Sequence, residues 1–205
     1  MKNRLEISDL SLAYGKRTIL ENISFTLAAG EAVALCGENG SGKTTLLTAA
    51  AGILRPTHGK IRRSGKVGYV PQSAALLEDM TFADNLRYFS AIARARVPQV
   101  LPLCADELRP MRVRDMSGGM KKLCSIVCTL VAAPDILLLD EPYAALDEAH
   151  AAMLTDYLGD FLQNGGSLLI AAHDEDEYLP LTSRRLLLTD GSMREETLTR
   201  AEAPV

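Results

Sequence analysis

The sequence predicts an α/β fold: a mostly parallel sheet, preceded by an antiparallel β portion and interrupted by a small helical lobe. Two observations predict the parallel sheet, namely the apolar runs Ala32–Cys36 and Ile136–Leu139. Neither run alternates with polar residues, as expected of parallel strands that are covered on both faces. The third observation is the glycine-rich segment Gly37–Thr44, which follows the first run and precedes a helical pattern. A strand, a tight loop and a helix in this order are typical of α/β folds.

The segment Gly37–Thr44 has the spacing of a phosphate-binding loop: a glycine, four residues, and then Gly42-Lys43-Thr44. Glycines let several backbone N–H groups turn inward around a phosphate chain, and the following helix adds its positive end. Lys43 can reach the β- and γ-phosphates, and the Thr44 hydroxyl can bind Mg²⁺. A plain glycine-rich turn is the alternative, but strand, loop and helix stand in the order that the motif requires. The sequence therefore predicts a nucleoside triphosphate site with Mg²⁺.

The composition excludes several classes of protein. Hydrophobic residues make up 47% and charged residues 23% of the 205 residues, which is typical of a globular chain rather than a disordered one. The net charge of −4 argues against a nucleic-acid binder that relies on a basic surface. The four cysteines form no C-x-x-C pair, so free thiols in a reducing, cytosolic setting are expected rather than a metal site. No stretch reaches the length of a membrane span, so any membrane part must come from another chain.

Before the loop, residues 4–10 and Ile23–Leu27 alternate and are predicted as half-buried strands. Tyr14 lies between them, where it can either stack on a purine base or cover the edge of the sheet. After the loop, a helix over Thr45–Ala51 ends near Gly52. Two short strands are expected at 60–63 and 66–70, with Gln72 on the loop that follows.

Residues 73–133 are predicted to form the helical lobe, inserted between core segments 1–72 and 134–205. Thr81 is a plausible N-cap for a helix with apolar residues at helical spacing. Ser117 suits the N-cap of a second helix, whose apolar residues recur at i, i+3, i+4, i+7 and i+8. By itself, the pattern Ser117-Gly118-Gly119 is better explained by a cap followed by a turn than by a binding function.

Two acids end the buried run Ile136–Leu139. Asp140 and Glu141 are therefore expected at the carboxyl edge of the sheet, where α/β folds bind their ligands. Asp140 is placed to hold Mg²⁺, and Glu141, one residue further, to polarise a water molecule. His173 ends the next predicted strand, Ser167–Ala172, in the same register as these acids, which favours a functional role. Asp147 is expected to cap the helix between these strands.

Taken together, these segments resemble the ATP-binding cassette family, the nucleotide-binding subunits of ABC transporters, over nearly the whole chain. Tyr14 corresponds to the family's aromatic residue, and six motifs follow it in the family's order. They are Walker A at Gly37–Thr44, the Q-loop glutamine at Gln72, the Met116–Met120 signature, Walker B ending in Asp140 and Glu141, the D-loop at Ala145–Asp147 and the switch histidine at His173. The signature departs from the usual Leu-Ser-Gly-Gly-Gln because Met120 replaces the glutamine. Its Ser-Gly-Gly-Met-Lys form resembles single-cassette ATPase subunits that pair with separate membrane exporters.

The resemblance implies ATP hydrolysis assisted by Mg²⁺. It implies that Glu141, His173, Lys43 and Gln72 are catalytic and that Thr44, Gln72 and Asp140 hold the metal. The residues implied in nucleotide binding are Tyr14, Gly37, Asn39, Gly40, Ser41, Gly42, Lys43, Thr44, Thr45, Ser117, Gly118, Gly119 and Asp147. Ser117 and Gly119 would act across a head-to-tail dimer, on the ATP held by a second ATP-binding subunit.

The resemblance also implies a location on the cytoplasmic face of a membrane, beside a membrane-spanning permease subunit. The apolar run Ala74–Leu77 and Met80 suit a contact with that permease, or alternatively the core of the lobe. A soluble ABC-type ATPase and a nucleotide-gated regulatory module are the competing functions. The second ATP-binding subunit can be an identical copy or a different chain.

Overall fold

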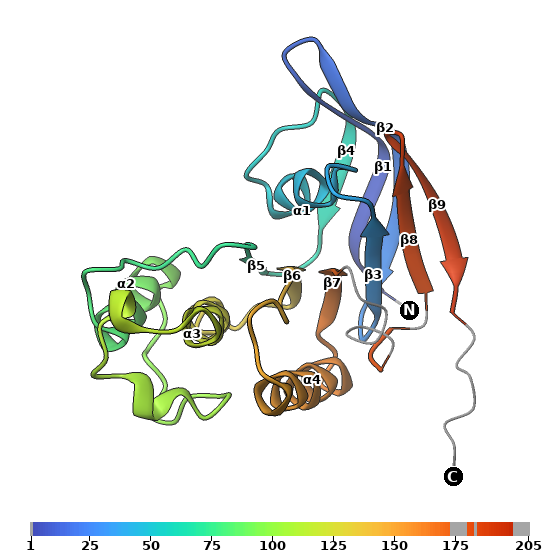
Figure 1. Ribbon diagram of the computed structural model, residues 1–205. Coiled ribbons are helices and arrows are strands. Elements are labelled where there is room, and N and C mark those ends of the chain that lie inside the picture. Colours follow the sequence, from blue (N-terminus) through green and yellow to red (C-terminus); the bar gives the residue numbers. More distant parts are fainter. Residues whose placement is uncertain (1, 173–179, 183, 199–205) are drawn as a thin grey trace.

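The computed structural model describes residues 2–172, 180–182 and 184–198. These residues form two β-sheets and the helices packed on them (Figure 1). The strands are β1 (Asn3–Tyr14), β2 (Arg17–Ala28), β3 (Ala32–Gly37), β4 (His58–Arg63), β5 (Val67–Val70), β6 (Ile136–Asp140), β7 (Ser167–Ala171), β8 (Arg184–Thr189) and β9 (Ser192–Thr197). The helices are α1 (Lys43–Ala51), α2 (Phe82–Ala93), α3 (Gly118–Leu130) and α4 (Glu148–Gln163), with the short 3₁₀ helices η1 (Ala105–Leu108) and η2 (Val113–Asp115).

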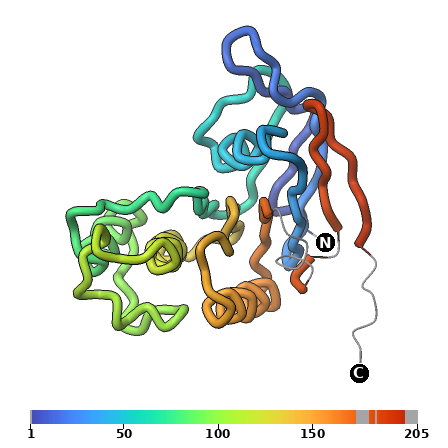
Figure 2. The backbone as a smooth tube through the Cα atoms, in the orientation of Figure 1, coloured from blue at the N-terminus to red at the C-terminus, as the bar shows by residue number. Residues whose placement is uncertain are grey.

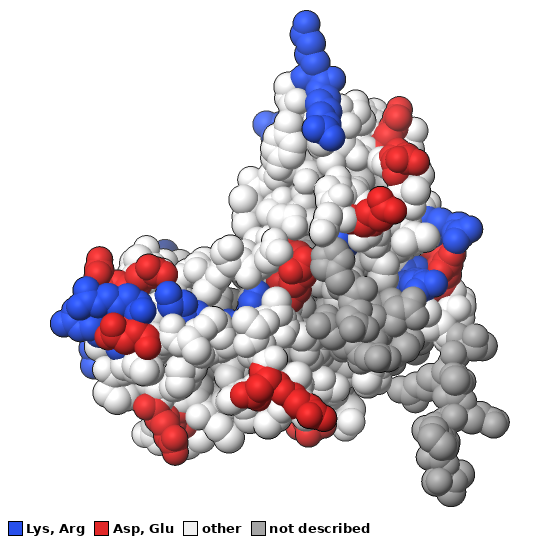
Figure 3. All heavy atoms as spheres, viewed as in Figure 1, with Lys and Arg blue, Asp and Glu red and all other residues white. Residues whose placement is uncertain are grey.

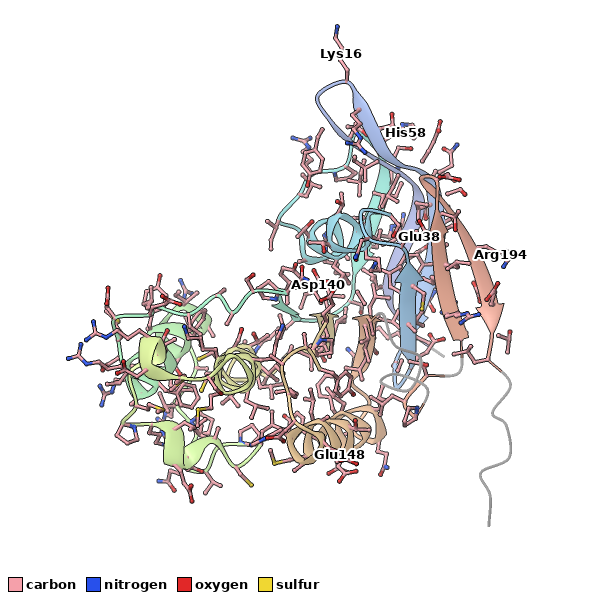
Figure 4. All side chains as sticks on the ribbon, in the orientation of Figure 1. Lys16, Glu38, His58, Asp140, Glu148 and Arg194 are labelled. Atoms are coloured by element: carbon pink, nitrogen blue, oxygen red, sulfur yellow. The ribbon has the colours of Figure 1, made fainter. Side chains whose placement is uncertain are left out.

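The smaller sheet is antiparallel and has the strand order β2-β1-β4. Strands β1 and β2 form a long hairpin whose tip carries Lys16, labelled in Figure 4. Both strands extend beyond the predicted segments, which covered residues 4–10 and 23–27. Tyr14 is therefore the last residue of β1 rather than part of a separate connection.

The larger sheet has the order β5-β6-β7-β3-β8-β9, in which every neighbouring pair is parallel except β8 and β9. The two short strands expected around Ser64 and Gly65 exist, but they belong to different sheets: β4 pairs with β1, and β5 pairs with β6. The chain crosses between the sheets at Gly65, whose φ of 125° is unfavourable for residues with a β-carbon. The residue patterns of these two short segments do not indicate their pairing partners, because β1 and β6 lie far away in the sequence.

The larger sheet is covered on both faces, as its apolar strands predicted. In β3, Val33 and Leu35 pack with α1 and the smaller sheet, whereas Ala32, Ala34 and Cys36 face α3 and α4. Figure 2 shows the same division, with α1 above the sheet edge and α3 and α4 below it. Helices α1 and α3 therefore lie on opposite faces of one sheet.

The segment between β5 and β6 holds α2, η1, η2 and α3. The Thr81 hydroxyl accepts from the Asp84 backbone N–H at 3.2 Å, which confirms the predicted N-cap of α2. Figure 3 shows basic and acidic side chains side by side at the outer end of this segment. Two of its ion pairs are Arg87–Asp84 (2.6 Å) and Arg114–Asp79 (3.4 Å). Among the described residues, no helix combines the length and the hydrophobicity that crossing a membrane requires.

Candidate functional site

The phosphate-binding loop joins β3 to α1 and depends on its glycines. Gly37, Gly40 and Gly42 have φ values of 144°, 83° and 105°. A β-carbon on Gly37 would lie 2.5 Å from the Leu188 carbonyl oxygen, and one on Gly42 would lie 2.9 Å from Leu20 Cδ2. Both the backbone angles and the surrounding atoms therefore exclude larger residues at these two positions.

Lys43 begins α1, and its ammonium lies inside the loop. Nζ donates to the Gly37 carbonyl at 2.7 Å and to the Glu38 carbonyl at 3.1 Å, and the residue is 7% exposed. Burial lowers the pKa of Lys43, while the charges of Glu141 and Asp140 oppose that shift. Phosphate oxygens are stronger acceptors than the two carbonyls, so this ammonium is ready to bind a phosphate chain.

Asp140 ends β6 and faces the start of α1. Its Oδ2 accepts from Thr44 Oγ1 at 2.7 Å and from Tyr69 Oη at 3.5 Å. Burial raises the pKa of Asp140, and the Thr44 hydrogen bond opposes the shift. Burial, together with the Asp140 charge, raises the pKa of Tyr69 to about 12, so the phenol stays a donor. Figure 4 labels Asp140, at the end of β6, and Glu38, on the loop after β3, at this edge of the sheet.

The pair Thr44–Asp140 suits Mg²⁺. A hydroxyl and a carboxylate are hard oxygen ligands, and their hydrogen bond shows that their oxygens already converge on one point. The described residues contain no group of three His, Cys, Asp or Glu side chains that could enclose a metal. A site with one carboxylate fits a cation that takes its remaining ligands from phosphates and water.

Glu141 and Gln72 also meet at this edge, although they follow different strands, β6 and β5. Gln72 Nε2 donates to Glu141 Oε2 at 2.8 Å. The Glu141 backbone has a φ of 48° and its N–H donates to the Ala171 carbonyl at 2.8 Å. A left-handed conformation is costly for a glutamate and is held here by the end of β7. The side chain is thereby directed away from the strand, towards the Q-loop.

The remaining nucleotide residues of the sequence prediction surround the loop. The Tyr14 side chain is 56% exposed, which leaves its ring available at the end of β1. Asn39 and Gly40 are exposed, Thr45 is half-buried, and the buried Ser41 hydroxyl has no hydrogen-bond partner in the described part of the chain. A cleft of about 700 Å³ extends from Gly37–Ser41 to the start of β2 and the β8–β9 turn. His173 lies outside the described residues.

The signature residues lie elsewhere. Ser117 caps α3 by accepting from the Met120 N–H at 3.2 Å, as predicted. A β-carbon on Gly119 would lie 2.6 Å from the Ala145 carbonyl oxygen, so this helix start packs directly on the backbone of the D-loop. Asp147 accepts from the His150 N–H at 2.9 Å and caps α4, also as predicted. Because α1 and α3 cover opposite faces of the sheet, the signature does not close over the phosphate loop of its own chain.

Two residues of the site were missed by the sequence analysis. Tyr69 donates to Asp140, as described above, and Lys122 approaches the Asp140 and Gln72 backbones from α3. A signal for Lys122 was present, since it lies four residues before Ile126 and so shares the core-facing stripe of α3. A lysine beside apolar residues of a helix is normally interpreted as solvent-exposed, and Lys122 was therefore not recognised as part of the site.

The family model described as "ABC transporter" matches residues 20–144, more than half of the chain. The chain belongs to the ABC transporter family. This ABC cassette is 34% identical to a Nod factor export ATP-binding protein I of Paraburkholderia xenovorans, over 91% of this chain and 68% of that protein. It is 36% identical to a cytochrome c biogenesis ATP-binding export protein of Ruegeria pomeroyi, over 82% of this chain and 84% of that protein.

A ribose import ATP-binding protein of Rhizobium etli is also similar, with 34% identity over 91% of this chain and 42% of that protein. The cassette therefore has relatives named for both directions of transport. Among solved structures, an ATP-binding subunit of an ABC transporter superposes with a TM-score of 0.82 and 27% identity, covering 95% of this chain and 90% of the other. The predicted family and the α/β P-loop fold are confirmed, and the chain is an ABC ATPase.

Proposed function

We propose that this cassette hydrolyses ATP at a head-to-tail dimer interface and thereby drives export through a separate membrane-spanning permease on whose cytoplasmic face it sits. The observation that carries the proposal is the separation of two half-sites on one chain. The loop of Lys43 holds the groups for phosphate and metal, and Ser117–Gly119 on the opposite face presents an uncharged helix start. A helix start binds anions but brings no cation and no general base.

Within the phosphate half-site, the residues have distinct roles. Lys43 and the loop N–H groups neutralise the β- and γ-phosphates, and Thr44 and Asp140, with Gln72, hold Mg²⁺. Bound there, Mg²⁺ would supply charge neutralisation for the transfer of the terminal phosphoryl group to water. Glu141 accepts a proton from the attacking water and is oriented by the Gln72 amide, which lies 2.8 Å away. His173 is assigned to the γ-phosphate by resemblance alone, since it lies outside the described residues.

The proposed dimer is based on the backbone N–H groups at the start of α3. The first N–H groups of α3 have no partner within the helix, and Ser117 and Gly118 are exposed there. In the proposed dimer they bind the γ-phosphate held by the other subunit, and Asp147 lies at the same interface. A solved dimer of a cassette bound to ADP and Pi shares the fold of this chain, with a TM-score of 0.80 and 21% identity.

Coupling to the permease is assigned to the segment after Gln72. The exposed fractions of Leu77 and Met80 are 38% and 46%, whereas Leu76 packs against the core. The apolar run is therefore divided between the core of the lobe and a surface next to the Q-loop. Export is supported by the Ser-Gly-Gly-Met-Lys signature and by the two relatives named as export proteins.

The test is Glu141→Gln, with Glu148→Gln in the first turn of α4 as the matched control. Loss of a general base should lower ATP turnover by about 100-fold or more. Equilibrium binding of ATP should be retained, because the loop and Lys43 are unchanged. With Mg²⁺ and ATP this variant should also run as a dimer in size-exclusion chromatography. Near-normal turnover, or a monomer even in the presence of its permease, would remove the proposal.

A further inference from the structure

Lys122 is the most deeply buried lysine of the described chain, with an exposed fraction of 4%. It lies on α3, two residues after the Met116–Met120 signature. Its Nζ is 2.7 Å from the Gln72 carbonyl oxygen, 3.2 Å from the Pro71 carbonyl oxygen and 3.5 Å from the Asp140 carbonyl oxygen. The ammonium therefore joins the signature helix to two separate points at the edge of the core.

These points are the carboxyl ends of two neighbouring strands. Val70 of β5 pairs in parallel with Leu139 of β6, and the peptides that Lys122 contacts follow directly after each of them. One of these peptides carries the Gln72 side chain, and the other leads into Glu141. The two side chains meet in a hydrogen bond of 2.8 Å. Lys122 thus holds the backbones from which both of these groups project.

Burying an ammonium requires compensation. Burial lowers the pKa of Lys122, whereas the charges of Asp140 and Glu141 favour the protonated form. The neighbouring Leu123, Cys124 and Ile126 pack in the apolar core, so an apolar residue would suit the interior of α3 equally well. A buried lysine that reaches three carbonyls at the catalytic edge is explained better by positioning than by packing.

We propose that Lys122 is a positioning residue: it clamps the Q-loop peptide to the end of β6, so that Gln72 and Glu141 keep the geometry needed to align the attacking water. Because the clamp starts from α3, it also ties the orientation of the signature helix to the catalytic edge of the same chain. The inference rests on the proposed role of Glu141.

The experiment compares Lys122→Met, Lys122→Arg and the control Lys66→Met in steady-state ATP hydrolysis and equilibrium nucleotide binding. Lys66 is an exposed lysine whose ammonium also donates to a backbone carbonyl, that of Ala132 at 3.2 Å, but it lies just before β5, at the other end of that strand from Pro71 and Gln72. Lys122→Met should lower kcat by about 10- to 100-fold, the range expected for small misplacements of catalytic groups. The KM for MgATP should change less than about threefold, since Lys43 and the loop are intact.

Lys122→Arg keeps a cationic donor and should recover part of the lost turnover, and Lys66→Met should match the wild type. If Lys122→Met does not fold, Lys122→Gln replaces it, since its amide retains two donors; the same split between kcat and KM is then expected, at smaller size. Wild-type turnover in the Met or Gln variant overturns the inference. So does a rise in KM in proportion to the loss of kcat, or an Arg variant no better than Met.

The two proposals fail separately. Near-normal turnover in Glu141→Gln removes the catalytic assignment on which the clamp depends. An inactive Glu141→Gln together with a fully active Lys122→Met leaves the catalytic assignment in place and removes only the clamp.

Discussion

The two nucleotide half-sites of this cassette are built in opposite ways. The phosphate half is charged: the buried Lys43 and Asp140 converge with the half-buried Glu141 at one sheet edge, and burial shifts the pKa values of Lys43 and Asp140. The signature half carries no charge on Ser117, Gly118 or Gly119, and offers only a capped helix start packed on the D-loop. In the proposed function, the first half binds a triphosphate by itself, whereas the second acts only on a phosphate that another chain holds. Variants in the two halves should therefore differ in their effects on ATP binding and on turnover.

The largest effect is expected in the phosphate half, from Lys43→Met. Losing the ammonium that is proposed to bind the phosphates should reduce hydrolysis by about 100-fold or more, as for other preorganised electrostatic groups. Unlike every signature variant, it should also weaken ATP binding to the isolated chain, measured by calorimetry. Lys16→Met, at the exposed tip of the β1–β2 hairpin, is the control and should leave both quantities unchanged. Unchanged binding in Lys43→Met would show that the loop is not the phosphate site.

Gly119→Ala should affect the signature half alone. The new methyl group would lie 2.6 Å from the Ala145 carbonyl oxygen and force the helix start and the D-loop apart. Overpacking of this kind costs about 1–3 kcal/mol of stability. Turnover should fall by about tenfold or more through misplacement of the helix start, while ATP binding to the isolated chain is retained. Gly118→Ala is the milder comparison, because its β-carbon would lie 3.3 Å from the Ala145 β-carbon. Equal effects of the two variants would contradict this packing argument.

The smallest effect is expected at Tyr14, which lies beyond the phosphate loop. Stacking of a base on an aromatic ring contributes about 1–3 kcal/mol, so Tyr14→Ala should weaken ATP binding by roughly tenfold. Tyr14→Phe keeps the ring and should bind like the wild type. The maximum turnover should change little in either variant. If ATP and inorganic triphosphate lose affinity equally in Tyr14→Ala, the ring does not contact the base.

The elements of the core could be predicted from local pattern. The runs Ala32–Cys36 and Ile136–Leu139 are strands, and Thr81, Ser117 and Asp147 cap their helices, because apolar periodicity and caps depend on nearby residues. The separation of β4 from β5 could not be predicted, since it depends on β1 and β6, far away in the sequence. The predicted boundaries of the helical lobe at 73 and 133 stay a prediction.

The site divides in the same way. The convergence of Thr44 with Asp140 was expected, because a loop after β3 and acids after β6 end at one edge of a parallel sheet. The hydrogen bond from Gln72 to Glu141 could not be predicted, since it depends on the path of the Q-loop. The contact of Lys122 with the Gln72 carbonyl could not be predicted either, since it depends on a lysine that is directed inward. The family's motifs indicate which residues have a function, but they do not indicate which of these side chains form hydrogen bonds with one another.

The most direct test of two complementary halves mixes two inactive variants. Lys43→Met lacks a working phosphate half, and Ser117→Arg blocks the signature half with a bulky cation. In a head-to-tail dimer of one copy of each, one composite site combines the intact loop of the Ser117→Arg chain with the intact signature of the Lys43→Met chain. The account predicts that an equimolar mixture hydrolyses ATP well above either variant alone, and that the rate depends on both concentrations. A mixture no more active than its parts, or a Ser117→Arg variant active by itself, would contradict it.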